Sequence, residues 1–156
     1  MSHETRHDQR VEEDGPGPEL TGRLGYLLKH AQLRLAELTA DALAPYGVTG
    51  RELAVLLVLA DREPASQQQA AGRLGIDRTT MVAFLDSLEG RGLVARRPDA
   101  SDRRRNVVVL TEAGQETVRL ATRASDDAER RFVAPLTRSS AAELKRALLA
   151  VIEKTP

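Results

Sequence analysis

The 156-residue sequence contains no cysteine and no tryptophan, and it has only two tyrosines and two phenylalanines. Without cysteine there is no disulfide, thiolate metal site, cysteine nucleophile or thiol-based redox sensor. No apolar run approaches the roughly 18 residues that a membrane-spanning helix needs, and residues 1–19 are acidic and polar, unlike a signal peptide. We therefore expect a cytoplasmic protein with no membrane segment.

Catalytic motifs are absent as well. The sequence has no P-loop, no HExxH zinc motif, no GxSxG nucleophile elbow and no dinucleotide-binding fingerprint. His3, Glu4 and His7 have a spacing suited to a metal site, but they lie in a polar stretch that we expect to be a flexible tail. The sequence therefore predicts no enzyme, no metal and no cofactor.

The charges of the chain balance in number but not in position. Lysine and arginine together number 23, as do aspartate and glutamate, so the formal net charge is zero. The length suits one domain, or one domain with an added helical dimerisation part. Between Arg96 and Arg105, however, five arginines face only two aspartates. This local excess of positive charge is the part of the charge pattern that carries functional information.

Helical periodicity begins after the tail. Apolar residues recur every three or four positions from Leu20 to about Ala44, where Pro45 and Gly47 end the pattern. A second helix is expected to start after Thr49, a good N-cap residue, and to reach about Ala60. The first of these helices is long for a small domain.

The next segment has the form of a helix-turn-helix. Ser66 and Gln69 have the spacing of a capping box at the start of a short helix, and Gly75 then makes a tight turn. Asp77 caps a second helix, which is predicted to run from Arg78 to about Gly90. A short helix, a tight turn with glycine and a second helix are typical of this DNA-binding layout.

The two sides of the second helix differ in character. The side predicted to face the core carries Met81, Leu85 and Leu88. The other side is small and polar, so it can lie close to a groove of DNA and reach base edges or phosphates with Arg78, Thr79, Thr80 and Ser87. Plain structural helix pairs share this geometry, so the motif alone does not decide the function.

A β-hairpin is predicted directly afterwards. Leu93–Arg97 and Asn106–Leu110 are of strand length, and turn residues lie between them, namely Pro98, Asp99, Ser101 and Asp102. A cationic tip suits contact with a polyanion, and a solvated loop is the alternative interpretation, because arginine outnumbers lysine throughout the chain. The order of the elements favours polyanion binding over a solvated loop, because a helix-turn-helix followed by a cationic hairpin is a winged helix.

Two more helices are predicted after the hairpin. Thr111 caps a long helix that ends near Pro135, and Ser139 or Ser140 caps a last helix with apolar positions from Leu144 onward. The predicted fold class is therefore mainly α with a small β-hairpin.

From about Leu20 to Ile152 the sequence resembles the MarR family of bacterial transcription regulators. The residues that carry the resemblance are Leu74–Val82, Leu88–Arg96, Asp102–Arg105 and Val109–Gly114. It implies a winged helix-turn-helix with long N- and C-terminal dimerisation helices, working as an obligate homodimer on double-stranded DNA. The chain would then divide into a flexible acidic tail (1–19), an N-terminal dimerisation helix (20–48), a DNA-binding lobe (49–111) and C-terminal dimerisation helices (112–156).

The resemblance also suggests roles for the residues of the hairpin tip. The wing motif of the family is an aspartate followed two residues later by an arginine that enters the minor groove, which here corresponds to Asp102 and Arg104. Asp102 is then expected to orient the Arg104 guanidinium, which the negative potential of a narrow minor groove attracts. Arg103 and Arg105 would contact phosphates, and Arg96 and Arg97 are weaker candidates.

Members of this family often bind small effectors between the dimerisation helices and the DNA-binding lobe. Tyr26, His30 and Arg34 form one row on the first predicted helix and are candidates for such a site, although a polar contact between helices explains the row as well. The absence of tryptophan excludes the urate-responsive branch, and the absence of cysteine excludes a peroxide-sensing cysteine.

We therefore predict a MarR-type transcription regulator, a ligand-responsive repressor that binds a pseudo-palindromic operator as a homodimer. The alternative is a winged-helix module that binds another protein and has no specific DNA site. In that alternative the arginine loop contacts an acidic partner, and a gel shift that shows no DNA binding even at low salt would favour it.

Overall fold

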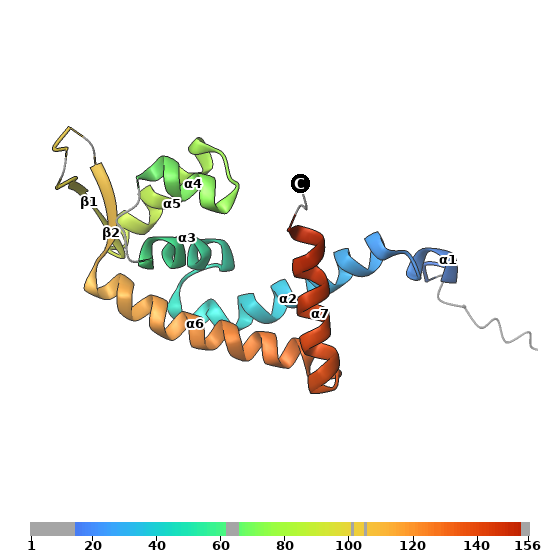
Figure 1. Cartoon of the computed structure of the whole chain (residues 1–156). Coiled ribbons are helices and arrows are strands. Elements are labelled where there is room, and N and C mark those ends of the chain that lie inside the picture. Colours follow the sequence, from blue (N-terminus) through green and yellow to red (C-terminus); the bar gives the residue numbers. More distant parts are fainter. Residues whose placement is uncertain (1–14, 62–65, 101, 105, 154–156) are drawn as a thin grey trace, which may run out of the picture. The chain divides into compact units, whose positions relative to one another are not determined.

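The computed structural model describes residues 15–61, 66–100, 102–104 and 106–153 (Figure 1). The chain divides into two compact units, one ending at Leu33 and the other beginning at Arg34. Helices predominate, and one antiparallel hairpin is the only sheet in the described ranges. The predicted class, mainly α with a small β-hairpin, is confirmed.

The first predicted helix is interrupted near its start. A short helix, α1, spans Pro18–Thr21, and α2 spans Leu24–Leu43. Pro18 occupies the first helical position, where its missing N–H is not needed, and Gly22 ends the turn because glycine has a low helix propensity. The expectation of one continuous helix from Leu20 was therefore wrong. Residues 1–14 of the predicted tail lie outside the described residues.

The start of the second helix is fixed by local side-chain bonds. After α2 a 3₁₀ turn, Ala44–Tyr46, leads to Gly47, which has a positive φ of 65°. Helix α3, Gly50–Ala60, then begins with a full capping box: the Glu52 amide donates to Thr49 Oγ1 (3.2 Å), and the Thr49 amide donates to Glu52 Oε2 (2.8 Å). The predicted cap at Thr49 is confirmed.

The helix-turn-helix forms as predicted. Helix α4 spans Gln67–Leu74, behind a capping box of Ser66 and Gln69, and ends at Gly75, which has a φ of 64°. Helix α5 spans Arg78–Gly90 and is capped by Asp77.

The hairpin pairs β1, Val94–Pro98, with β2, Asn106–Leu110, in antiparallel register, Val94 opposite Leu110 and Pro98 opposite Asn106. Pro98 is therefore part of the strand and not of the turn, contrary to expectation. It takes the last pair of a two-stranded sheet, where a residue without an N–H is tolerated.

The junction between hairpin and next helix is tightly packed. Helix α6 spans Glu112–Val133 and is capped by Thr111, which accepts from the Gly114 amide (3.0 Å) and donates to the Gly92 carbonyl (2.6 Å). Gly114 is buried, and a Cβ there would lie 1.9 Å from the Leu93 carbonyl oxygen. Only glycine fits at this point, which explains a glycine in the first turn of a helix.

The last helix, α7, spans Arg138–Ile152. Its cap is Thr137, which accepts from the Ser140 amide (3.1 Å), so the predicted cap at Ser139 or Ser140 was wrong. Ser140 is instead the third helical residue, whose N–H needs the capping acceptor.

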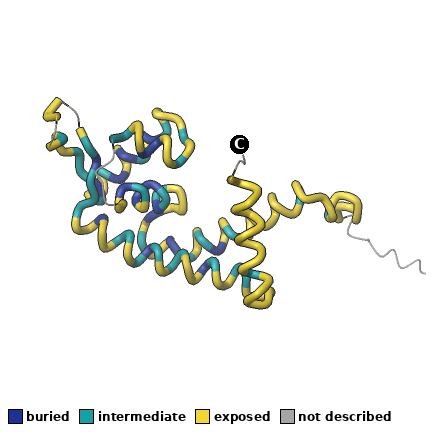
Figure 2. The backbone as a smooth tube through the Cα atoms, in the orientation of Figure 1, coloured by how far each residue is buried: buried dark blue, intermediate teal, exposed yellow. Residues whose placement is uncertain are grey.

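The core lies where α3, α4, α5, both strands and the start of α6 meet, and it appears as the buried segments of Figure 2. Its largest fully buried side chains are Leu43, Val55, Leu56, Met81, Leu85, Leu88 and Val108. Helix α7 has no buried residue and is exposed over almost all its length in Figure 2. In the described ranges no single helix is long and apolar enough to cross a membrane; a consecutive pair bent by 69°, Leu24–Tyr46 and Gly50–Ala60, reaches that length and composition only together.

Candidate nucleic-acid interface

We call α3, α4, α5, β1 and β2 the winged lobe. Its exposed residues on α5 include Arg78, Thr79, Ala83 and Ser87, and all of these except Arg78 have small side chains. The buried side of the same helix carries the predicted core residues Met81, Leu85 and Leu88. The two predicted sides of α5 are therefore confirmed, and the exposed side is shallow enough for close approach to a flat or grooved partner.

Thr80 differs from its neighbours on α5. It is half-buried, and both its amide (2.9 Å) and its hydroxyl (2.6 Å) donate to the Asp77 carboxylate. These two bonds hold the pKa of Asp77 below its ordinary value. The Thr80 hydroxyl is thus engaged in capping α5, and its contribution to the surface is to fix the start of the helix.

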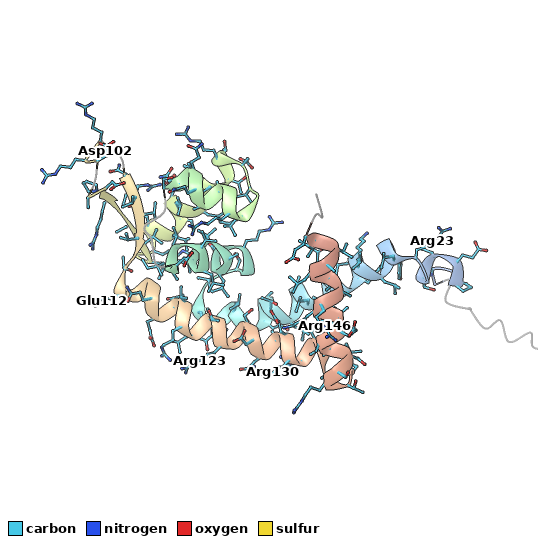
Figure 3. All side chains as sticks on the ribbon, viewed as in Figure 1. Arg23, Asp102, Glu112, Arg123, Arg130 and Arg146 are labelled. Carbon is cyan, nitrogen blue, oxygen red and sulfur yellow. The ribbon has the colours of Figure 1, made fainter. Side chains whose placement is uncertain are left out.

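The loop between the strands presents cations at its tip. Asp102, Arg103 and Arg104 are exposed, and Figure 3 shows Asp102 at the far end of the hairpin. No acid in the described ranges forms an ion pair with Arg97, Arg103 or Arg104. Unpaired guanidiniums at a protruding tip form an anion-binding surface. Arg105, a fourth predicted contact, lies outside the described residues.

Asp102 shapes the tip in a way that the sequence did not indicate. Its Oδ1 accepts from the backbone amide of Arg104 (3.0 Å), and this is the bond that joins the two residues. The contact is a local turn of the kind that aspartate forms two residues ahead of its partner. We expected Asp102 to hold the Arg104 guanidinium. The structure instead shows the Asp102 carboxylate bonded to the main-chain amide of Arg104, so this bond does not hold the guanidinium.

Arg96, considered a weak DNA contact, points inward. Its guanidinium pairs with Asp86 (2.5 Å) and with Glu89, both on α5, and its amide donates to Glu89 Oε1 (3.2 Å). The hydrogen bond with Asp86 is the main reason that the pKa of Arg96 is raised. Arg96 thus connects the hairpin to α5.

Arg91, which sequence reasoning missed, makes a similar connection at the end of α5. Its guanidinium donates to the Gly47 carbonyl (2.5 Å) and pairs with Glu52 (2.5 Å), while its Nε donates to the Ser87 carbonyl (3.3 Å). The end of α5 is thereby joined to the start of α3. Its partners lie 39 and 44 residues away in sequence, so no local pattern signals the contact.

The predicted effector row lies on α2. The rings of Tyr26 and His30 stack with centroids 4.1 Å apart and a tilt of 35°. Arg34 pairs with Glu37 at 3.2 Å and is exposed. That these residues line an effector site stays a prediction.

Comparison with known proteins agrees with this geometry. A model of the MarR family matches residues 46–105. The chain is 30% identical over 96 residues to the HTH-type transcriptional repressor NicR of Pseudomonas putida, covering 62% of this chain and 61% of that protein. It is 32% identical over 91 residues to the transcriptional regulator HosA of Escherichia coli, covering 58% and 67%. The first curated relatives are matched over about three fifths of their length.

Solved structures match over more of the chain. The repressor CouR bound to a 23-mer DNA duplex is 37% identical, with a TM-score of 0.81, over 87% of this chain and 96% of that one. CouR bound to p-coumaroyl-CoA is 34% identical, also with a TM-score of 0.81, over 91% and 100%. The matched family model covers the helix-turn-helix and β1 but ends before β2, and the structural matches cover most of the chain, including β2. The chain belongs to the MarR family.

Proposed function

We propose that this protein is a transcription repressor that binds operator DNA through the winged lobe. The observation that carries the proposal is the presence of two surfaces in one lobe: the exposed side of α5 with its small side chains, and a hairpin tip whose Arg103 and Arg104 pair with no acid in the described ranges. A helix of this kind suits the major groove, and a cationic tip suits the backbone or the minor groove beside it. The protein would act on chromosomal DNA in the cytoplasm and would catalyse no reaction.

Each predicted site residue has a role in this proposal. On α5, Arg78, Thr79 and Ser87 would contact bases or phosphates, and Thr80 would fix the helix start. On the hairpin, Arg104 would enter the minor groove from the turn that Asp102 forms, with Arg103 and Arg105 on phosphates. Their exposure, and the absence of an ion-pair partner among the described residues, support Arg103 and Arg104.

A homodimer would complete the fold. Helix α7 leaves the side chains of Leu144, Leu148, Leu149, Val151 and Ile152 exposed, by 37% to 81%. In the first unit Leu20, Leu24, Leu27, Leu28 and Leu33 are exposed by 45% to 70%. Exposed apolar surfaces of this kind are typical of interfaces with a partner. We propose that residues 20–48 and 112–156 pair with a second copy and present two winged lobes (49–111) to one pseudo-palindromic operator.

A small molecule would relieve repression. CouR, a repressor of similar structure, is bound to DNA in one structure and to p-coumaroyl-CoA in another. We propose by analogy that this protein also responds to an effector, with Tyr26, His30 and Arg34 as candidate contacts. An effector acts by favouring dimers whose lobes no longer match the half-site spacing.

The proposal is tested by incubating the purified protein with fragmented genomic DNA and sequencing what it retains. The expected result is enrichment of a few fragments that share a pseudo-palindrome, bound as one dimer per site. Retention of no fragment even at low salt would reject the proposal and favour a winged-helix module that binds protein.

A further inference from the structure

Helix α5, the recognition helix of the proposed DNA-binding surface, carries two acids that would oppose DNA binding if they were unpaired. Asp86 and Glu89 lie three residues apart on α5, so they share one side of the helix. A free carboxylate beside DNA repels phosphate and weakens binding. Both acids are partly exposed, by 60% and 38%, and both are paired with the same arginine.

That arginine, Arg96, comes from the middle of β1. It pairs with both acids and adds a bond from its own amide to Glu89, and its side chain is only 25% exposed. We call this set of three residues, Arg96, Asp86 and Glu89, the wing clasp. Arg97, its neighbour on the strand, is exposed and pairs with no acid in the described part of the chain. Consecutive residues of one strand thus have opposite roles.

The wing clasp lies at the point along the hairpin where burial in the core ends. Val94, at the base of the hairpin, and Val108, opposite Arg96, are buried in the core, whereas Arg97 and Pro98 on the way to the tip are exposed. Gly92, with a φ of 71°, precedes the strand and is a natural pivot. Arg96 lies opposite Val108, two residues nearer the tip than Val94, and its bonds run to the second half of α5.

We propose that Arg96 is a positioning residue: through Asp86 and Glu89 it fixes the angle between wing and recognition helix, so that both surfaces meet DNA without prior ordering. This rests on the proposed function. Preorganisation raises affinity because the freedom of the hairpin is not lost on binding. The clasp also neutralises the two acids at the DNA-facing end of the lobe.

Glu89→Gln tests the clasp by the sign of its effect. If Glu89 only repels DNA, removing its charge strengthens operator binding. If it holds the wing, the same change weakens binding, by about tenfold given the strength of a charged hydrogen bond. Glu112→Gln is the matched control, an exposed acid of the same region without an arginine partner in the described ranges, and it is expected to leave affinity unchanged or slightly higher.

Arg96→Gln tests the same idea from the other side. Operator affinity is expected to fall about tenfold, while the slope of log K against log salt stays at the wild-type value, because no phosphate contact is lost. Arg97→Gln is the matched control for the lost charge, and Arg96→Lys, which keeps the charge, is expected to recover part of the affinity. Thermal melting of each variant is measured as well, and an unchanged melting temperature indicates an intact fold.

Three results would overturn the clasp: unchanged affinity in Arg96→Gln, a salt slope reduced by about one unit in that variant, which marks a direct phosphate contact, or stronger binding in Glu89→Gln. Failure of the proposed function is distinguishable, since the wild-type protein would then bind no operator at all.

Discussion

The winged lobe and helix α7 differ in how much of their apolar surface is buried within a single chain. In the lobe, all three helices, α3, α4 and α5, begin with a side-chain cap, and large apolar side chains such as Leu56 and Met81 are fully buried. Helix α7 has a cap but buries no residue. The lobe therefore buries its apolar side chains within one chain, whereas α7 leaves apolar side chains exposed, on the surface that we propose pairs with a second copy. Stability should depend on the lobe, and assembly on α7.

Gly114→Val should have the largest effect, because it disrupts the lobe where the hairpin joins α6. The new Cβ would lie 1.9 Å from the Leu93 carbonyl oxygen, which also accepts from the Thr111 amide (3.1 Å). We expect unfolding to become easier by about 4 kcal/mol, measured by denaturant titration. Gly72→Ala, at a helical glycine with open space, should be neutral or slightly stabilising. Equal stability of the two variants would contradict the packing described.

Leu144→Ala combined with Leu148→Ala should affect assembly and leave the lobe folded. Both side chains are exposed on α7, and each is expected to be covered in the dimer. We expect the dimer to weaken by about 3 kcal/mol, roughly a hundredfold in dissociation constant, measured by sedimentation. Leu57→Ala, an exposed leucine of α3, is the control. A dimer of unchanged affinity would show that α7 is not the interface.

Arg104→Ala should reduce operator affinity without altering stability or assembly. We expect a loss of about 1 to 3 kcal/mol, measured by fluorescence anisotropy, if the side chain enters the minor groove. Arg103→Ala should lower the salt slope by about one unit if it meets a phosphate. Arg131→Ala, an exposed arginine of α6 outside the lobe, should change neither quantity. Wild-type binding by both tip variants would remove the wing from the interface.

The smallest expected effect is the pH dependence of the cap on α5. Hydrogen bonds from Thr80 lower the pKa of Asp77 below its ordinary value of 3.8, so the charged cap stabilises the lobe above that pH. This contribution is lost as the pH falls through the lowered pKa. The melting temperature of the wild-type protein should therefore fall more between pH 5 and pH 2 than that of Asp77→Asn, whose cap does not titrate. Parallel falls would show that the cap charge is not involved.

The parts of the fold that sequence predicts are those that local chemistry decides. Thr49, Ser66, Asp77 and Thr111 are caps whose partners lie three residues away, and all four were predicted. The hairpin was predicted because its strands flank a turn-rich, arginine-rich loop.

The parts that sequence missed depend on long-range contacts or on competition between neighbouring signals. Arg91 and Arg96 are chemically like the tip arginines, and only the fold brings carboxylates to them. Thr137 was passed over for Ser139 and Ser140 because several hydroxyl residues compete for one cap. Asp102 was given the wrong partner atom, since spacing identifies a residue and not whether its main chain or side chain is bonded.

The most direct test of the central claim is the operator affinity of the wild-type protein and of a variant with both Arg103→Ala and Arg104→Ala, measured from about 50 to 200 mM salt. The structure predicts tight wild-type binding that falls steeply with salt, and a variant that binds more weakly with a shallower slope. Equal affinity and equal slope in the two proteins would contradict the assignment of the winged lobe as the DNA-binding surface.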